Sequence, residues 1–190
     1  MDDNGSVTEA GDLYRRRADA FAAVIDGVAP GDWGRPSPCE GWTARDVVAH
    51  VVGFSGQVLR ERAGVSVDVP AVEVDPAGAF HGVREAVQRA LDDPETPAEV
   101  SYYLDGSLSF DLPQHQWDLA AATGQDATLD PAEVDVLWRE LSGMRQGWWD
   151  WHHRNGWYGR PVDVPEDASL QDRVLGMIGR DPRWRPPAGA

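Results

Sequence analysis

The sequence predicts an all-α protein, a helix bundle followed by one further short helix. Apolar residues recur at helical spacing in five successive segments, a pattern typical of amphipathic helices. A long connection after the second segment can join parallel neighbours in such a bundle. The stretch 65–75 alternates apolar and polar residues, but its Pro70 lacks a backbone donor and argues against a central strand.

The first helix is predicted at residues 7–28. Its apolar positions lie near helical spacing, and Pro30 and Gly31 follow as typical stop signals. The next segment, 32–42, reads DWGRPSPCEGW and is rich in residues that favour turns. We therefore expect an irregular connector that leads the chain to the second helix.

The second helix is predicted at residues 43–63. Thr43 followed by Asp46 fits a variant of the capping box, in which hydroxyl and carboxylate satisfy free amides of the first turn. Gly64 is expected to close this helix. Residues 65–75 then form an extended crossover.

The third and fourth helices are predicted at residues 76–92 and 107–123. Pro76 suits the first turn of a helix, where its missing amide costs nothing. Gly124 is placed to end the fourth helix. Pro113 inside that helix is an irregularity, because its ring removes one backbone donor and tends to bend the helix.

A fifth helix is predicted at residues 131–152, with a broad apolar face that could pack across the others. Turn-forming residues dominate after Gly156, and residues 169–179 predict a short final helix. The chain shows no internal repeat. Its length of 190 residues favours a single domain over residues 1–190.

The charge of the chain excludes two classes of partner. Its 17 basic residues face 32 acidic ones, giving a formal net charge of −15, which repels phosphate backbones and anionic lipid surfaces. No apolar run is long enough to span a membrane, and the first residues do not resemble a secretory signal. We expect no nucleic-acid or membrane partner, a cytoplasmic location, and a monomer or homodimer.

Three polar residues interrupt apolar helix faces and are candidate metal ligands. His50 lies in the apolar stripe of the second helix. Asp111 and His115 are four residues apart, so one face of the fourth helix can present both to one ion. A core histidine bonded to a buried aspartate would show the same spacing, so both interpretations stand at this point. The single cysteine, Cys39, excludes a cluster of several thiolates within one chain.

Several other polar residues have ordinary structural interpretations. Asp46 is expected to cap the second helix rather than bind a metal. His81 is expected at the solvated surface, and His152 and His153 at the surface or at the rim of a pocket. Cys39 is expected to pack as a small buried hydrophobic residue.

The nine tryptophans are expected mainly in the core, although some could line a pocket for an aromatic or sugar-bearing ligand. Trp148, Trp149, Trp151 and Trp157 are the candidates for that pocket. Two more tryptophans, Trp42 and Trp117, are expected near the three candidate ligands.

Three blocks of the sequence resemble the DinB-like superfamily, and more narrowly its actinobacterial metal-binding branch related to mycothiol-dependent maleylpyruvate isomerase. These blocks are PSPCEGWTARDVVAHV at 36–51, DLPQHQWDLAAATGQD at 111–126 and VPEDASLQDRVLGMIGRDP at 164–182. The resemblance implies a four-helix bundle with up-down-down-up topology. It also implies a divalent metal held by one histidine of the second helix and by an acidic residue and a histidine of a later helix. These positions correspond to His50, Asp111 and His115.

The resemblance further implies a function. A metal, most simply zinc but with nickel, manganese or iron as alternatives, would activate a small thiol such as mycothiol for transfer to an electrophile or for isomerisation. No general acid or base is assigned. The three ligands also match non-haem iron oxygenases, and a bundle with a purely structural metal is a further alternative.

Two departures from the isomerase bear on this expectation. The isomerase carries an additional C-terminal domain that contributes to substrate binding, whereas this chain is expected to end about where the bundle ends, so the particular substrate of the isomerase does not carry over. Asp111 stands where the isomerase has a glutamate, and Pro113 lies between the two ligands of the fourth helix.

Overall fold

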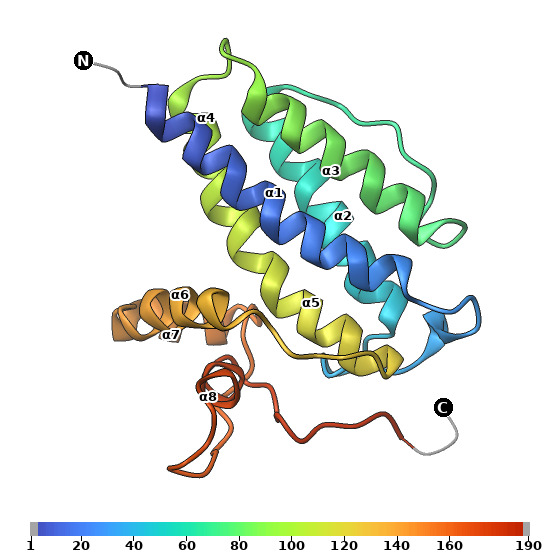
Figure 1. Ribbon diagram of the computed structural model, residues 1–190, viewed down its shortest axis with the longest axis vertical. Helices are drawn as coiled ribbons and strands as arrows, with labels where there is room; N and C mark the ends of the chain where they lie inside the picture. Colours follow the sequence, from blue (N-terminus) through green and yellow to red (C-terminus); the bar gives the residue numbers. More distant parts are fainter. Residues whose placement is uncertain (1–3, 188–190) are drawn as a thin grey trace.

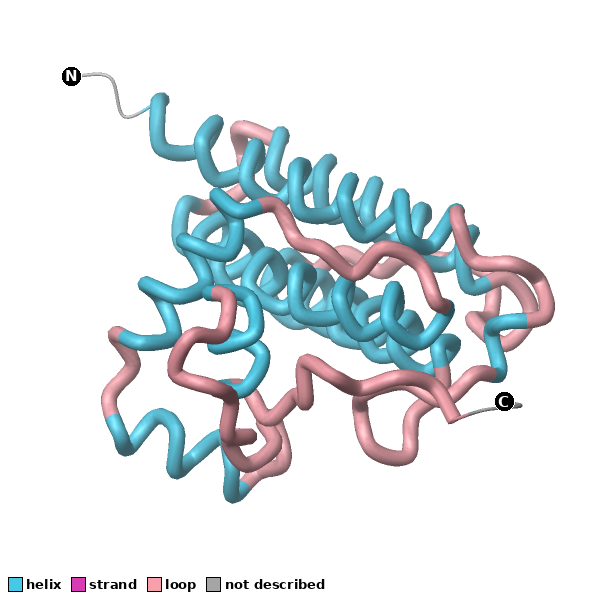
Figure 2. Tube along the Cα trace, turned by 60° about the horizontal axis from the view of Figure 1, so that its bottom comes forward, coloured by secondary structure: helices cyan, strands magenta, loops and turns pink. Residues whose placement is uncertain are grey.

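The four longest helices of the described residues are α1 (Asn4–Asp26), α2 (Ala44–Val58), α3 (Pro76–Asp92) and α5 (Ser109–Thr123). In the computed structural model, which describes residues 4–187, α1 and α2 each pack against both α3 and α5 (Figure 1). Figure 2 shows helices joined by loops throughout. Apart from one isolated bridge between Pro36 and Thr43, the described residues contain no β-structure. The predicted all-α class is therefore confirmed.

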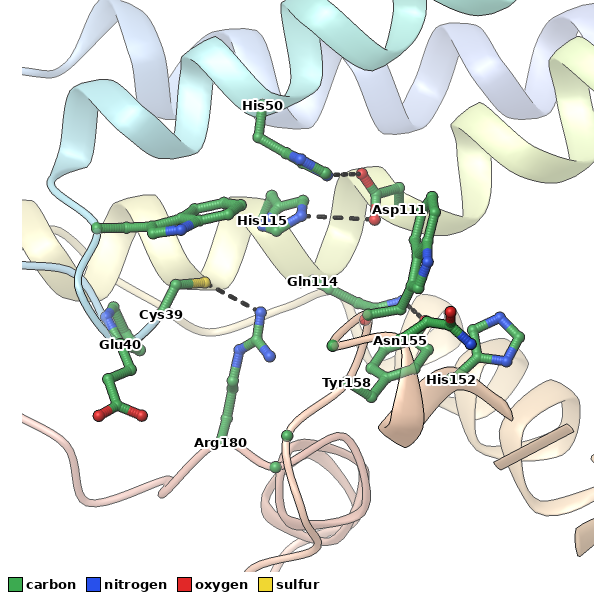
Figure 3. Close-up of a pocket in the computed structure, with 16 residues that line it drawn as sticks. Cys39, Glu40, His50, Asp111, Gln114, His115, His152, Asn155, Tyr158 and Arg180 are labelled. Carbon is green, nitrogen blue, oxygen red and sulfur yellow. Dashed lines mark hydrogen bonds and ion pairs between the residues drawn. The ribbon is translucent and has the colours of Figure 1, made fainter. Parts of the chain in front are cut away.

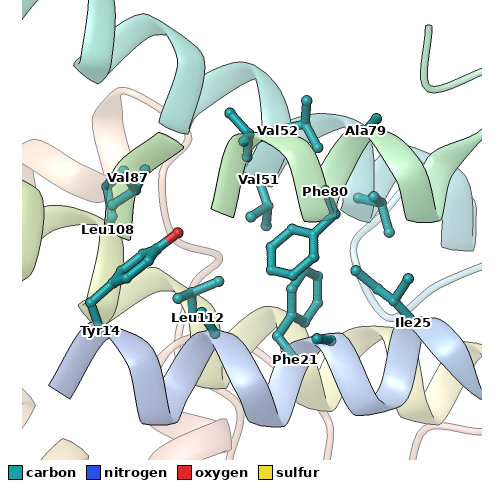
Figure 4. Close-up of a cluster of buried hydrophobic side chains, with 14 of the residues drawn as sticks. Tyr14, Phe21, Ile25, Val51, Val52, Ala79, Phe80, Val87, Leu108 and Leu112 are labelled. Atoms are coloured by element: carbon teal, nitrogen blue, oxygen red, sulfur yellow. The ribbon is translucent and has the colours of Figure 1, made fainter. Parts of the chain in front are cut away.

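The interior of the four helices is apolar (Figure 4). Phe21 of α1 and Phe80 of α3 meet edge to face, with ring centroids 4.9 Å apart and planes at 84°. Both rings are fully buried. Aromatic pairs in this geometry contribute beyond the area they bury, so this contact ties α1 to α3 at the centre of the core.

The capping box predicted at the start of α2 is present. Asp46 N donates to Thr43 Oγ1 at 3.3 Å, and Thr43 N donates to Asp46 Oδ2 at 2.8 Å. The helix continues into a π-helical turn, η2 (Leu59–Ala63), and stops at Gly64, whose φ of 67° suits glycine. The crossover that follows contains no helix or strand, as expected.

The helix predicted at 107–123 begins earlier than expected. A short helix, α4 (Ala98–Tyr103), runs through a π-helical turn, η3 (Leu104–Leu108), directly into α5. A π-helical turn has more residues per turn than an α-helix, so the apolar positions here depart from the 3.6-residue period on which the prediction was based. Pro113 lies inside α5, just after its first turn.

The helix predicted at 131–152 is two helices, α6 (Pro131–Ser142) and α7 (Gln146–Arg154). Gly143 follows α6, and Arg145 before α7 is extended, with ψ of 151°. The apolar pattern continued across this break, which is why the sequence predicted one helix. The predicted short final helix is present as α8 (Leu170–Met177).

The helices after α5 lie beside the bundle (Figure 1) and contribute to a second apolar cluster. Leu137 and Leu141 of α6 pack with Val174 and Leu175 of α8, and Trp117 of α5 belongs to the same cluster. This cluster packs Ile178 and Trp184, which follow α8, together with Trp117 of α5. Among the described residues, no helix is both long and apolar enough to cross a lipid bilayer.

Candidate metal centre

The structure brings the three candidate ligands together between α2 and α5 (Figure 3). His50 Nε2 lies 3.2 Å from Asp111 Oδ2, and His115 Nε2 lies 3.4 Å from Asp111 Oδ1. One ligand atom from each residue falls within 4.8 Å of the other two. Asp111 thus stands between two imidazoles that come from different helices.

The donor set fits a divalent ion. Zinc sits about 2.0–2.1 Å from imidazole nitrogen and carboxylate oxygen, so two donors of a tetrahedral site lie about 3.3 Å apart. The separations of 3.2 Å from His50 to Asp111 Oδ2 and 3.4 Å from His115 to Asp111 Oδ1 are close to this spacing, with each imidazole facing a different oxygen of the carboxylate. Two neutral imidazoles and one carboxylate are ligands of zinc and of other first-row metals.

A fourth residue, Asp118, holds the other face of His115. His115 Nδ1 lies 3.0 Å from Asp118 Oδ2, and the Asp118 side chain is fully buried. Asp118 is one turn after His115 on α5, so its position on the same face could have been predicted from the sequence. It was not singled out there.

Arg180, from the chain just after α8, neutralises Asp118. Its Nε donates to Asp118 Oδ1 at 3.0 Å and its Nη2 to Asp118 Oδ2 at 2.9 Å. A two-pronged contact of this kind is the strong geometry for a guanidinium and a carboxylate. No local sequence pattern indicated Arg180, because the contact joins residues 62 positions apart.

Cys39 also belongs to this cluster, which corrects the expectation that it packs as a small buried hydrophobic residue. Its thiol donates to Asp118 Oδ2 at 3.2 Å, and Arg180 Nη2 donates to its sulfur at 3.1 Å. The residue is only half-buried. Burial, and then the charge of Asp118, raise the pKa of the Cys39 thiol.

The ionisation of the cluster follows from these contacts. Burial alone would raise the pKa of Asp111, but the imidazoles of His115 and His50 outweigh it and hold that pKa below its usual range. Burial likewise opposes ionisation of His115, but Asp111 and Asp118 raise its pKa well above the ordinary value. Arg180 and His115 overcome the burial of Asp118 and lower its pKa.

The site opens on a cavity of about 530 Å³ between the bundle and the C-terminal helices (Figure 3). Trp42, His152 and Trp157 line it together with the ligands. His152, for which a surface or rim position was expected, lies in the lining of this cavity, and Trp42 lies beside the site as predicted. Gln114 of α5 donates to the Tyr158 hydroxyl at 3.2 Å, so Tyr158 is a further lining residue that the sequence did not indicate.

The other candidate residues have structural roles. Trp117 is buried in the second apolar cluster. His81 Nε2 lies 2.8 Å from Asp26 Oδ1 at the surface of the bundle, in agreement with the predicted surface position. Asp46 caps α2, as expected.

Comparison with known proteins places the chain in a family. Residues 14–175 match the model of the mycothiol maleylpyruvate isomerase N-terminal domain. Two uncharacterised proteins from two strains of Mycobacterium tuberculosis are each 37% identical over 131 residues, which cover 62% of this chain and 69% of theirs. No solved structure matches the chain significantly. The chain belongs to the family of mycothiol maleylpyruvate isomerase N-terminal domains.

Proposed function

We propose that this protein binds one divalent metal ion through His50, Asp111 and His115 and uses it to activate a small thiol of the mycothiol type. The reaction would be transfer of that thiol to an electrophile, or an isomerisation that the thiol assists. The observation that carries the proposal is the convergence of three ligand atoms within 4.8 Å on the wall of a cavity. Family membership supports the choice of thiol.

The contact between His115 and Asp118 supports a metal at Nε2. An imidazole that donates its Nδ1 proton to a carboxylate leaves the Nε2 lone pair free for a metal, and such carboxylates typically orient histidine ligands. Asp118 is buried and fixed by Arg180, so it can hold the ring of His115 in one orientation. His50 and Asp111 need only small adjustments around that fixed ring.

The openness of the site supports a catalytic ion over a structural one. Structural zinc sites are closed by four protein ligands, whereas catalytic sites keep a position for water or substrate. Here the side chains of His50 and Asp111 are 28% and 25% exposed and face the cavity. An ion with three protein ligands at this place would therefore be reachable by a small thiol.

When bound, zinc would supply a Lewis acid that lowers the pKa of a thiol and holds it as thiolate at neutral pH. The residues that line the cavity would bind and orient the thiol and the electrophile. Trp42 and Trp157 offer apolar surfaces to the non-reacting parts of the ligands, and the Tyr158 hydroxyl and Gln114 offer polar contacts. We further propose a cytoplasmic location, where small thiols stay reduced.

Metal analysis of the purified protein tests the proposal. We expect about one equivalent of zinc, nickel, manganese or iron per chain in the wild type and loss of that metal in His50→Ala and His115→Ala. His81→Ala is the matched control, because His81 is a helix histidine that also faces an aspartate but lies outside the cavity. Metal retained in both ligand variants would contradict the proposed site.

Activity is tested with the metal-loaded protein, mycothiol and a panel of electrophiles. We expect thiol consumption that depends on both the metal and His50. Iron in the purified protein together with oxygen-dependent turnover would instead indicate an oxygenase. No turnover, combined with strong coupling of the metal to melting, would indicate a structural ion.

A further inference from the structure

His115 is shared by two groups of potential metal ligands. One is the proposed site, and the other consists of Cys39, His115 and Asp118, whose ligand atoms also lie within 4.8 Å of one another. The ring faces Asp118 through Nδ1, at 3.0 Å, and Asp111 through Nε2, at 3.4 Å. The two groups therefore use opposite nitrogens of one imidazole.

The guanidinium of Arg180 lies against the second group. It contacts both oxygens of Asp118, at 3.0 and 2.9 Å. It also contacts the sulfur of Cys39, at 3.1 Å (Figure 3). The Arg180 side chain is 11% exposed and that of Asp118 is fully buried, so solvent screens this charge little. Two of the three donors in the second group thus already face a fixed positive charge.

We propose that Arg180 acts as a built-in cation that keeps metal away from Cys39, His115 and Asp118 and so reserves His115 Nε2 for the ion in the proposed site. The inference rests on the proposed function for the identity of that first site. A divalent ion placed among Cys39, His115 and Asp118 would lie within a few ångströms of the guanidinium and would be repelled. Because no metal binds the Asp118 carboxylate, it can continue to orient the ring of His115.

The consequence concerns Cys39. Without the positive charge of Arg180, a metal can enter the second group, displace the thiol proton of Cys39 to solvent and bind the resulting thiolate in place of the guanidinium. Thiolate is a preferred ligand of zinc and cobalt. Arg180 would thus decide whether the ion has nitrogen and oxygen ligands only or also a protein sulfur ligand. Arg180 lies after the residues that the family model matches, which end at 175.

Cobalt(II) titration tests the proposal, because a thiolate bound to cobalt gives an intense near-ultraviolet charge-transfer absorption. We expect no such absorption in the wild type and its appearance in Arg180→Gln, in which the amide can still donate to Asp118 but the charge is gone. The double variant Cys39→Ser with Arg180→Gln should bind cobalt without that absorption. Far-ultraviolet circular dichroism verifies that each variant is folded.

Two matched variants separate charge from bulk and position. Arg180→Lys keeps the positive charge and should show no thiolate absorption. Arg183→Gln removes an exposed arginine whose side chain pairs with Asp181, and should also behave as the wild type. Absorption in Arg180→Lys equal to that in Arg180→Gln would overturn the argument from charge.

A measurement on the wild type stands even if Arg180→Gln does not fold. We expect alkylation of Cys39 by iodoacetamide at the same rate with and without zinc, because the ion does not bind its sulfur. Protection of Cys39 from alkylation by zinc would overturn the proposal, and so would thiolate absorption in the wild type. A folded Arg180→Gln variant that binds cobalt without thiolate absorption would also overturn it. Failure of the proposed function would give a different result: the wild type and the His50→Ala variant would then bind cobalt equally well.

Discussion

Asp118 is the residue on which most polar contacts of the site converge. Its carboxylate accepts hydrogen bonds from Cys39 and Arg180 and lies 3.0 Å from His115 Nδ1. The imidazole ring of His115 stands between this carboxylate and the proposed metal position. Carboxylates that orient histidine ligands typically change metal affinity by about 10–100-fold when removed. The role of Asp118 would therefore show in affinity as well as in folding.

We predict that Asp118→Asn lowers zinc affinity by about 10–100-fold, because a neutral amide holds the His115 ring less firmly. Competition with a chromogenic chelator measures this. Asp135→Asn, an exposed position on α6, is the matched control and should bind as the wild type. Equal affinities for the two variants would show that Asp118 has no part in orienting His115.

At the scale of elements, the start of α2 places His50. The capping box at Thr43 fixes the first turn, and His50 follows within two turns. We predict that Thr43→Ala lowers the free energy of unfolding by about 1 kcal/mol, because it removes the acceptor of the Asp46 amide. Urea denaturation measures the loss. Thr43→Ser keeps the hydroxyl and should lose less than half as much; equal losses would mean that the threonine methyl, not the cap, carries the effect.

Elements with clear local signals were predicted well. The helix expected at 76–92 has these bounds in the structure, because Asp75 and Pro76 mark its first turn. The π-helical turn η3 was missed because its apolar positions depart from the 3.6-residue period, and the break at 143–145 was missed because the apolar pattern continues across it. Periodicity reports which face is buried more reliably than it reports where a helix is interrupted.

The residues of the candidate site also divide into those that the sequence indicated and those that it did not. His50, Asp111 and His115 could be selected because each interrupts an apolar helix face. Arg180 could not, because its partner is 62 residues away and the contact depends on how the C-terminal helices pack. The position of Cys39 against that pair depends on the path of the connector before α2 and was likewise beyond local patterns.

At the scale of the whole molecule, we predict that folding does not depend on the metal. The two apolar clusters contain the long helices and the C-terminal helices, and neither uses the candidate ligands. We therefore expect a chelator to leave helix content unchanged in far-ultraviolet circular dichroism. Loss of helix on chelation would show that the ion is structural.

The bound ion should still stabilise the native state by mass action. Zinc at about 100 times its dissociation constant contributes about 2.7 kcal/mol, which for a chain of this size raises the melting temperature by about 5–10 °C. Differential scanning calorimetry measures the shift. It should vanish in His50→Ala and persist in His81→Ala, and an equal shift in both variants would mean that zinc binds elsewhere.

The most direct test of the central claim is an anomalous diffraction map of crystals of the zinc-loaded protein. We predict one strong peak about 2.0–2.2 Å from His50 Nε2, His115 Nε2 and a carboxylate oxygen of Asp111, with the remaining position open to the cavity. A peak bonded to the sulfur of Cys39, or no peak between α2 and α5, would contradict the account.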